Sequence, residues 1–326
     1  MSQTEANKEI VRQFLLAGAA KDENTMRSVL APEAHLSLMI AGVYSPHLKA
    51  FPHGTYWDRE GLIARELDFQ QQLQRPFELQ ILSLIAEGDA VAAEVLGKGH
   101  RAATGTPYIQ HYSYHFQLSR GRITDIRLYH DTFHHWQVFS DLGAGVEPAY
   151  LKPRRAPSIT QGPIDDPAGV GPTEDQVATS KTNVRRFLMA VRNHDPQATR
   201  EAWSPVGMWS FAIGGDYSPD LRAFEGAPRW DIEGMLYMTQ NANKAPREPL
   251  HMDIYSLIAE GDRLCAEAIG VLVRANGRAY RQHYSIHFKA RSGQLLEGHV
   301  YQDTLHQYDV TLDPPDGGPV AARSSS

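Results

Sequence analysis

The spacing of hydrophobic residues in the first 75 residues of the chain is helical. Apolar residues recur every three or four positions over residues 7–20 and predict a helix there. A second, short helix is expected around residues 24–30. A third is expected from Asp58, a residue type that caps helix N-termini, to about residue 73.

After Pro76 the pattern changes to the alternation that is typical of strands, with turn residues such as Glu87-Gly88-Asp89 between the alternating segments. Four strands are predicted, over residues 77–86, 90–99, 108–118 and 123–133. We therefore predict an α+β fold, in which three helices pack on a curved antiparallel sheet. The helices and the concave face of the sheet would form a cone with a pocket inside.

The same pattern occurs twice along the chain. The segment Leu84–Asp89 recurs as Leu257–Asp262, 173 positions later, and Gln110–Ser113 recurs as Gln282–Ser285, 172 positions later. Matches that follow in order along a whole domain do not arise from composition, so they predict a duplicated domain.

Two domains are therefore expected, residues 1–140 and residues 178–312, and they are called the first unit and the second unit below. Residues 141–177 carry six prolines among glycines and are predicted to be an exposed linker. The tail, residues 313–326, is expected to be disordered.

Composition narrows the classes of function. A net charge of −6 without basic blocks argues against nucleic acid as a partner. The absence of an 18-residue apolar run and the polar first residues predict no membrane span and no secretory signal, so a cytoplasmic protein is expected. The single cysteine, Cys265, excludes an internal disulfide and a cysteine-based metal cluster, and its apolar surroundings in the sequence favour an inert buried thiol.

The order of elements resembles a known superfamily. The segment Tyr56–Gly61 at the start of the third helix and the late turn Gly121-Arg122-Ile123 resemble the nuclear-transport-factor-2-like (NTF2-like) superfamily, and within it the SnoaL-like and ketosteroid-isomerase-like branch. The resemblance covers both units. It implies that the two sheets pack back to back as an internal pseudo-dimer, and it leaves a homo-oligomer open.

Members of this superfamily include isomerases, dehydratases, polyketide cyclases, epoxide hydrolases, a cofactor-free lyase that removes formaldehyde from lignin-derived diarylpropane diols, and non-catalytic binding modules. The fold alone does not choose among them. SnoaL-like cyclases carry a catalytic Asp on the strand before the last hairpin. The corresponding positions here are Tyr114 and Ile286, which weakens the cyclase interpretation.

The first unit offers imidazole, carboxylate and phenol groups instead. The candidate catalytic residues are Tyr44, His47, Glu94, His111 and Asp131. The candidate substrate-binding residues are Tyr112, Tyr114, His115 and His134, together with Tyr217, Glu267, His283 and Asp303 in the second unit.

Several of these residues have a structural alternative. If Glu94 faces the pocket, apolar walls would raise its pKa and make it a general acid or base; otherwise it lies on the outer face. Asp131 could orient a histidine or accept from a backbone N–H. Tyr44 could stabilise an oxyanion or fill a turn fixed by Pro46.

His111 and His115 share a strand face but lie about 13 Å apart at roughly 3.3 Å per residue, too far to bind one ion. No metal is expected, and each histidine is either catalytic or a hydrogen-bonded group on the outer face of the sheet. The two units also differ, because His47, Tyr114 and His130 are replaced by Asp220, Ile286 and Gln302. The chemistry is therefore expected in the first unit.

The sequence contains no dinucleotide-binding glycine motif, phosphate loop, nucleophile elbow or metal-binding motif. These absences favour an acid–base enzyme without a cofactor. The expected function is a lyase of the dehydratase or deformylase type that acts on a small hydrophobic, aromatic and hydroxylated substrate, such as a lignin-derived diaryl diol. The alternatives are an isomerase or hydrolase on the same fold and a non-catalytic small-molecule-binding protein.

Overall fold

The computed structural model describes residues 2–40, 55–139, 172–212, 229–241, 248–274 and 277–311. Three predicted site residues, Tyr44, His47 and Tyr217, lie outside these ranges, and so do the tail and most of the predicted linker.

The first unit has the order helix, helix, strand, strand, helix, four strands, helix. Its elements are α1 (Gln3–Ala20), α2 (Glu23–Val29), β1 (Leu30–Leu38), β2 (Tyr56–Asp58), α3 (Arg59–Gln71), β3 (Glu78–Glu87), β4 (Ala90–His100), β5 (Pro107–Ser119), β6 (Arg122–His130) and α4 (Thr132–Phe139). Asp58 caps α3 as predicted, since its carboxylate accepts from the backbone N–H of Gly61 at 2.8 Å.

The second unit has the same order of elements. They are α5 (Glu174–Asn193), α6 (Pro196–Ala202), β7 (Trp203–Phe211), β8 (Arg229–Trp230), α7 (Ile232–Asn241), β9 (Glu248–Glu260), β10 (Arg263–Val273), β11 (Ala279–Arg291), β12 (Gln294–Gln302) and α8 (Thr304–Thr311). A capping box at Thr173 and Gln176 starts α5 within the range that was predicted as linker.

Each unit contains one six-stranded sheet. The strand order is β2-β1-β6-β5-β4-β3 in the first sheet and β8-β7-β12-β11-β10-β9 in the second. The predicted α+β class is confirmed. The sheets are mixed rather than purely antiparallel, because β1 runs parallel to β6 and β7 runs parallel to β12. Each unit also ends in a fourth helix, α4 or α8, that the sequence analysis did not predict. The first two residues of α4 had been assigned to the last strand.

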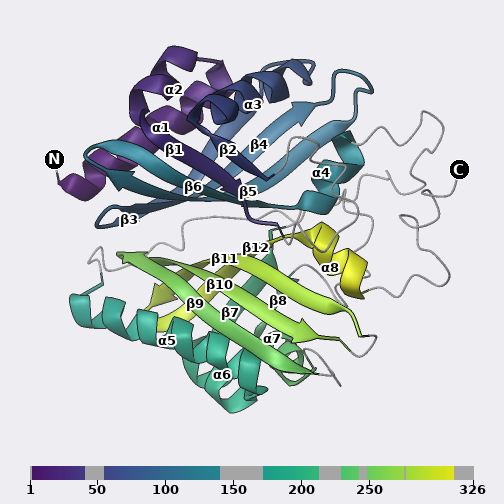
Figure 1. The fold of residues 1–326 in the computed structure, drawn as a ribbon. Helices are drawn as coiled ribbons and strands as arrows, with labels where there is room; N and C mark the ends of the chain where they lie inside the picture. Colours follow the sequence, from purple (N-terminus) through teal and green to yellow (C-terminus); the bar gives the residue numbers. More distant parts are fainter. Residues whose placement is uncertain are drawn as a thin grey trace, which may run out of the picture.

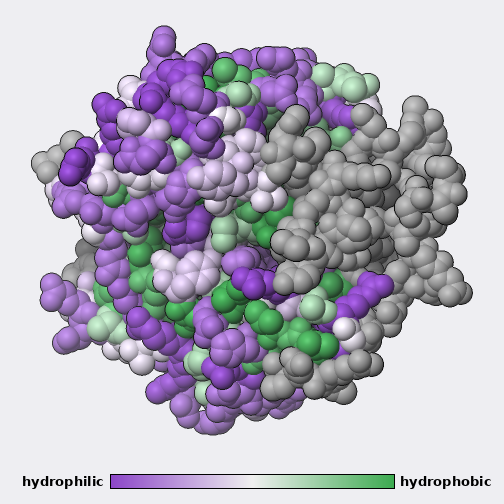
Figure 2. All heavy atoms as spheres, viewed as in Figure 1, coloured by the Kyte–Doolittle hydropathy of each residue, from purple (hydrophilic) through white to green (hydrophobic). Residues whose placement is uncertain are grey.

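The two sheets face each other, and helices α1 to α3 and α5 to α7 cover their outer sides (Figure 1). Each sheet therefore has a concave face that packs on its own helices and a convex face that packs on the other unit. On the side of the molecule seen in Figure 2, hydrophobic residues gather mainly across the middle, where the two units meet, whereas the outer helices are mostly hydrophilic. We call the contact between the convex faces the interface.

Apolar and charged contacts both hold the interface together. Ile85 and Ala92 of the first unit form a buried cluster with Ile258 and Cys265 of the second. Lys8 of the first unit forms an ion pair with Glu260 of the second at 2.6 Å. The equivalent residues with the units exchanged, Lys181 and Glu87, also pair at 2.6 Å. The contacts thus come in pairs that are related by an approximate twofold exchange of the units.

Within the described residues, no helix is both long enough and apolar enough to cross a membrane.

Candidate active site

The alternation along β5 divides its side chains between the cone and the interface. Tyr108, Tyr112 and Phe116 belong to the core cluster between the sheet and the helices of the first unit, and Tyr114 packs against that cluster. The intervening Ser113 and His115 contact the second unit. Residues of one strand therefore serve two different sites, according to their parity.

The cone of the first unit contains a small cavity with a volume of about 40 Å³. Its walls come from α1, α3 and the strands β3, β5 and β6, and they combine aromatic rings with polar groups. The lining residues that are used below are Phe14, Phe69, Phe77, Arg65, Glu66, Tyr108, Tyr112, Tyr114, His130 and His135. Apolar walls with a few convergent polar groups are typical of small-molecule sites.

A hydrogen-bonded relay crosses one side of this cavity. The Tyr112 hydroxyl donates to the Tyr108 hydroxyl at 3.0 Å, and Tyr108 lies 3.0 Å from Nδ1 of His135. Burial raises the pKa of both tyrosines far above the usual value and lowers the pKa of His135 to about 3. The tyrosines therefore stay protonated and the imidazole stays neutral at physiological pH.

A charged pair also lines the cavity. Arg65 and Glu66 of α3 form an ion pair, and their side chains are 23% and 18% exposed. Tyr114 faces this pair across the cavity: burial raises its pKa, and the Glu66 carboxylate adds to the rise. The cavity thus holds a carboxylate, an imidazole and three neutral phenols, which are the groups that acid–base catalysis requires.

The corresponding space in the second unit is occupied differently. Trp203 and Trp209 stand at the positions of Leu30 and Leu36, and both indoles pack against Phe187 with ring centroids 5.2 Å apart. Tyr108 and Tyr112 are retained as Tyr280 and Tyr284, whereas five other polar groups of the first cavity are replaced. Arg65, Glu66, Tyr114, His130 and His135 correspond to Met238, Thr239, Ile286, Gln302 and Gln307. The combination of acid and base groups is therefore specific to the first unit.

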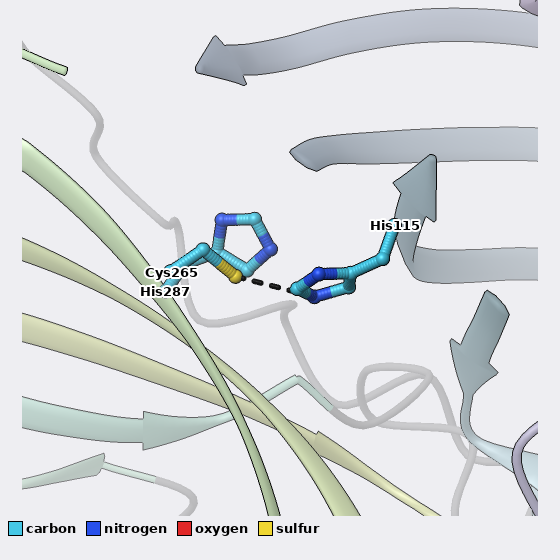
Figure 3. Close-up of side chains that lie close together, drawn as sticks. All are labelled: His115, Cys265 and His287. Carbon is cyan, nitrogen blue, oxygen red and sulfur yellow. Dashed lines mark hydrogen bonds between the residues drawn. The ribbon is translucent and has the colours of Figure 1, made fainter. Parts of the chain in front are cut away.

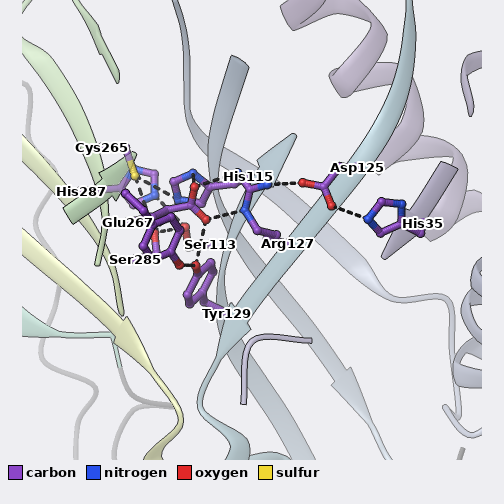
Figure 4. A network of polar contacts seen from close by, with 11 residues as sticks. His35, Ser113, His115, Asp125, Arg127, Tyr129, Cys265, Glu267, Ser285 and His287 are labelled. Atoms are coloured by element: carbon purple, nitrogen blue, oxygen red, sulfur yellow. Dashed lines mark hydrogen bonds and ion pairs between the residues drawn. The ribbon is translucent and has the colours of Figure 1, made fainter. Parts of the chain in front are cut away.

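The convex faces carry a second set of titratable residues, which is buried in the interface. Glu94 is 2% exposed, and its carboxylate accepts from His299 and from the Tyr301 hydroxyl, each at 3.0 Å. Glu267 is fully buried and accepts from Arg127 and Tyr129, each at 2.8 Å (Figure 4). Burial on its own would raise the pKa of both carboxyls. The neighbouring imidazole, guanidinium and hydroxyl donors outweigh this effect and hold the pKa of both carboxyls well below the usual range.

A chain of hydroxyls and imidazoles connects the two carboxylates. Ser113 and Ser285 meet at the centre with their oxygens 2.7 Å apart. Ser113 lies 2.8 Å from Nε2 of His287, and Ser285 lies 2.8 Å from Nε2 of His115. Each imidazole turns its Nδ1 toward a carboxylate of the opposite unit. Both ends of the chain are thus anchored by a glutamate.

The two strand-end aspartates also cross the interface. Asp303 accepts from Thr132 at 2.5 Å, and Asp131 accepts from Thr304 in the matching contact. Each carboxylate also accepts from a backbone N–H of the helix that follows it, His134 in one unit and His306 in the other, at 3.0 Å. Both aspartates therefore act as N-terminal caps and inter-unit contacts.

The structure divides the predicted site residues into two groups. Tyr112 and Tyr114 line the cavity, and His134 stacks on Tyr108 with ring centroids 5.4 Å apart. The predicted residues on the convex face or at the strand ends of the interface are Glu94, His111, Asp131, His115, Glu267, His283 and Asp303.

Parity explains why Glu94 does not face the cone. Val91, Ala93 and Val95 pack in the core of the first unit, so the intervening Ala92 and Glu94 face the other sheet. Glu94 is not a solvated residue of the outer face either, because the second unit buries its side chain. His111 lies on the same face of the sheet as Glu94, and burial lowers its pKa to about 4. For His111 and His115 the structure agrees with the outer-face alternative.

Sequence reasoning did not single out Arg65, Glu66 or His135. A signal for Glu66 was present, because Leu62, Glu66 and Phe69 follow the spacing of one helical face. A charged residue within an apolar stripe is a candidate for a pocket group. His135 carried no comparable signal, because residues 123–133 were assigned to a strand and α4 was not expected.

Comparison with known proteins agrees with this fold. No protein-family model matches the chain, and no curated protein matches its sequence. Solved structures match about one unit at a time. An NTF2-like protein from Burkholderia xenovorans LB400 is 19% identical with a TM-score of 0.33, and the match covers 42% of this chain and 97% of that protein.

A candidate SnoaL-like polyketide cyclase from Jannaschia sp. CCS1 is 17% identical with a TM-score of 0.36, and the match covers 43% of this chain and 96% of that protein. An epoxide hydrolase of M. tuberculosis, described as LEH-like, is 20% identical with a TM-score of 0.32, and the match covers 42% and 90%. The likeness concerns the fold alone.

Proposed function

We propose that the first unit is a small-molecule lyase that works by acid–base chemistry inside its cone. The observation that carries this proposal is the convergence of the Glu66 carboxylate, the neutral His135 imidazole and three protonated tyrosines on one apolar cavity. The proposal is also supported by the second unit, in which the residues equivalent to Glu66, His135 and Tyr114 are replaced. The choice of a lyase follows the family resemblance of the sequence.

The groups have complementary roles in an elimination. Glu66 is the base that takes a proton from the substrate, and Tyr114, which faces it, is the acid that protonates a departing hydroxyl. The relay from Tyr112 through Tyr108 to His135 leaves the Tyr112 oxygen as an acceptor that can hold a substrate hydroxyl in place. The rings of Phe14, Phe69 and Phe77 form apolar walls suited to an aromatic ring.

For a 1,3-diol with aryl groups, the proposed step balances as follows. Glu66 removes the proton of the terminal hydroxyl, whose oxygen becomes the carbonyl oxygen of formaldehyde as the adjacent C–C bond breaks. The electron pair of that bond forms an alkene, and the benzylic hydroxyl leaves as water with a proton from Tyr114. In a simple dehydration, Glu66 takes a C–H proton instead, and water is again the leaving group.

The size of the cavity sets a condition on this proposal. A volume of about 40 Å³ holds only a few water molecules at roughly 10–15 Å³ each. An aromatic substrate therefore requires the cavity to widen. Arg65 and Glu66 are the partly exposed ion pair of the lining and have long, flexible side chains, so they are the ones that we expect to move on binding.

The test is mass spectrometry of products after incubation of the protein with a panel of aromatic diols and related alcohols. Loss of water or formaldehyde is expected, with the rate falling about 10²-fold or more in Glu66→Gln and Tyr114→Phe. Tyr284→Phe removes the second-unit hydroxyl that is equivalent to that of Tyr112. It is the control for a change in the other cone and is expected to retain the wild-type rate. A gain of water would indicate a hydrolase, and a rearranged product of unchanged mass would indicate an isomerase.

The alternative function is non-catalytic binding of a small molecule. The polar groups of the lining favour it, because Arg65 pairs with Glu66 and Tyr112 bonds to Tyr108, so these groups already satisfy one another. Ligand binding measured by calorimetry, weakened by Tyr114→Phe and unaccompanied by any product, would establish this function in place of the lyase.

A further inference from the structure

Three potential metal ligands from the two units meet at the centre of the interface. His115 lies on β5, whereas Cys265 and His287 lie on β10 and β11, and their donor atoms are all within 4.8 Å of one another (Figure 3). Each residue is at most 4% exposed. The imidazole Nε2 of His115 is 3.3 Å from the sulfur of Cys265.

We propose that His115, His287 and Cys265 form a binding site for a transition-metal ion such as Zn²⁺, which joins the two units. Two imidazoles and one thiolate are a ligand set that suits Zn²⁺, Co²⁺ or copper. Ligand bonds of about 2.0–2.3 Å place tetrahedral nitrogen and sulfur ligand atoms roughly 3.3–3.5 Å apart, and the donor atoms lie within 4.8 Å of one another, so the cluster needs to contract by about 1.5 Å at most.

The surroundings of the histidines match those of metal ligands. Nδ1 of His115 lies 3.2 Å from Glu267, and Nδ1 of His287 lies 3.7 Å from Glu94, both at ion-pair distance. A carboxylate at Nδ1 holds the proton on that nitrogen and turns the Nε2 lone pair toward the ligand. In both histidines, Nε2 is the atom that faces the centre of the cluster.

A count of protons shows what the ion would supply. With a proton on each Nδ1, the hydroxyls of Ser113 and Ser285 and the thiol of Cys265 have three protons for five contacts: one between the hydroxyls, one from each hydroxyl to an imidazole, and two made by the thiol, to His115 and to Ser285. Two contacts are then short of a proton. An ion that accepts both Nε2 lone pairs removes this shortfall, because the hydroxyls then need to satisfy only each other and the ion.

The charges of the interface point to the same conclusion. The carboxylates of Glu94, Glu267 and Asp125 face one permanent cation, Arg127, so this group carries a net charge of −2 with neutral imidazoles and a thiol. A divalent ion with a Cys265 thiolate adds +1 and reduces the net charge to −1. Partial neutralisation of buried charge favours occupancy of the site.

The first test is uptake of Co²⁺, which reports on its ligands through its absorption. The full chain is unfolded in denaturant with a chelator and is refolded with or without one equivalent of Co²⁺. Wild type is expected to bind one ion per chain, with a thiolate-to-cobalt charge-transfer band and the visible bands of tetrahedral Co²⁺. The melting temperature should rise by roughly 5–10 °C with the ion.

Cys265→Ala is the decisive variant, because the equivalent position of the first unit is already an alanine, Ala92. The variant should fold and should lose the band, the bound ion and the thermal shift. His251→Ala removes an exposed histidine on β9 and is the control for surface binding; it should behave like wild type.

Equal uptake by wild type and Cys265→Ala, or octahedral Co²⁺ without a thiolate band, would overturn the proposal. Refolding without uptake would also overturn it. If refolding itself fails, the readout is the metal content of protein produced in zinc-supplemented medium. About one zinc per chain in wild type and none in Cys265→Ala is the expected result, and equal contents would contradict it.

Discussion

At the scale of single residues, the two buried glutamates show how small differences between the units change an otherwise paired contact. Glu94 and Glu267 occupy equivalent positions, and each accepts from a tyrosine hydroxyl of the opposite unit. Their other donors differ, because Glu94 meets the imidazole of His299 and Glu267 meets the guanidinium of Arg127.

This difference predicts unequal costs for the same substitution. Glu267→Gln removes the more deeply buried of the two carboxylates that pair with Arg127, which keeps Asp125, and is expected to lower the free energy of unfolding by roughly 3 kcal/mol or more. Glu94→Gln leaves only neutral donors and is expected to cost about 1–3 kcal/mol. Urea denaturation of both variants at pH 7 measures the difference, and equal costs would contradict the assignment of the charged pair.

His135 predicts a dependence of stability on pH. Burial lowers its pKa to about 3 in the folded protein, below the ordinary value of 6.5. The unfolded chain therefore takes up the proton first, so stability falls as the pH drops below about 6.5 and continues to fall toward pH 3. At pH 5 this one group lowers the free energy of unfolding by up to about 2 kcal/mol relative to pH 7.

His135→Gln tests this prediction, because the counterpart in the second unit is Gln307. The variant should lose less stability than wild type between pH 7 and pH 5 in urea titrations. The buried glutamates act in the same direction only at lower pH, since their contribution is lost as the pH falls below about 4.5. A pH profile that His135→Gln leaves unchanged would mean that the imidazole is not held neutral by the fold.

At the scale of elements, a glycine on β4 permits an aromatic ring of the cone to pack directly on the sheet. A Cβ added to Gly97 would lie 2.1 Å from the Phe77 ring. At the equivalent Gly270, the nearest atom, on Tyr284, would be 3.1 Å away. The first unit is therefore more tightly packed at this point of the sheet.

We expect Gly97→Ala to lower the free energy of unfolding by about 1–3 kcal/mol, because the Phe77 ring must move. Gly270→Ala is the matched control and should cost clearly less. Chemical denaturation measures both. A cost for Gly270→Ala equal to that for Gly97→Ala would show that the ring of Phe77 does not pack on β4 as described.

The elements also show which parts of the structure the sequence could predict. Alternation identified β3 to β6 and helical spacing identified α1 to α3, because both are local patterns. The parallel pairing of β1 with β6 joins residues 90 or more positions apart and has no local signal. The last strand was predicted to end at residue 133, three residues beyond the end of β6, since the apolar residues at the start of α4 continue the run of β6.

The candidate site was predicted in part for the same reason. Tyr112 and Tyr114 were found because phenols within an apolar strand stand out. For Glu94, alternation separates the two faces of β4 but does not say which face meets the helices when both faces are buried. The cluster of His115, Cys265 and His287 joins residues from both units, so spacing within either unit could not reveal it.

At the scale of the whole molecule, the back-to-back sheets explain why the titratable residues fall into two groups. The convex faces use glutamates, histidines and serines to join the units, whereas the concave face of the first unit keeps its own polar groups in the cone. The second cone is packed with tryptophan. The molecule thus resembles a dimer in which one half carries the candidate site.

This arrangement predicts the behaviour of the first unit on its own. Without the second unit, Glu94 and Ala92 would be exposed on the convex face. Two copies can cover this face, because Glu94 of each copy would meet Arg127 of the other, as Glu267 does in the intact chain. Residues 1–140 should therefore sediment as a dimer in analytical ultracentrifugation, and a stable folded monomer would contradict the role given to the interface.

The central claim is that the chemistry belongs to the cone of the first unit. The most direct measurement compares the product-formation rates of Tyr112→Phe and Tyr284→Phe, which remove equivalent hydroxyls from the two units, on a substrate found by product mass spectrometry. The account predicts a loss of about 10-fold or more in Tyr112→Phe and an unchanged rate in Tyr284→Phe. Equal rates, or a loss confined to Tyr284→Phe, would contradict it.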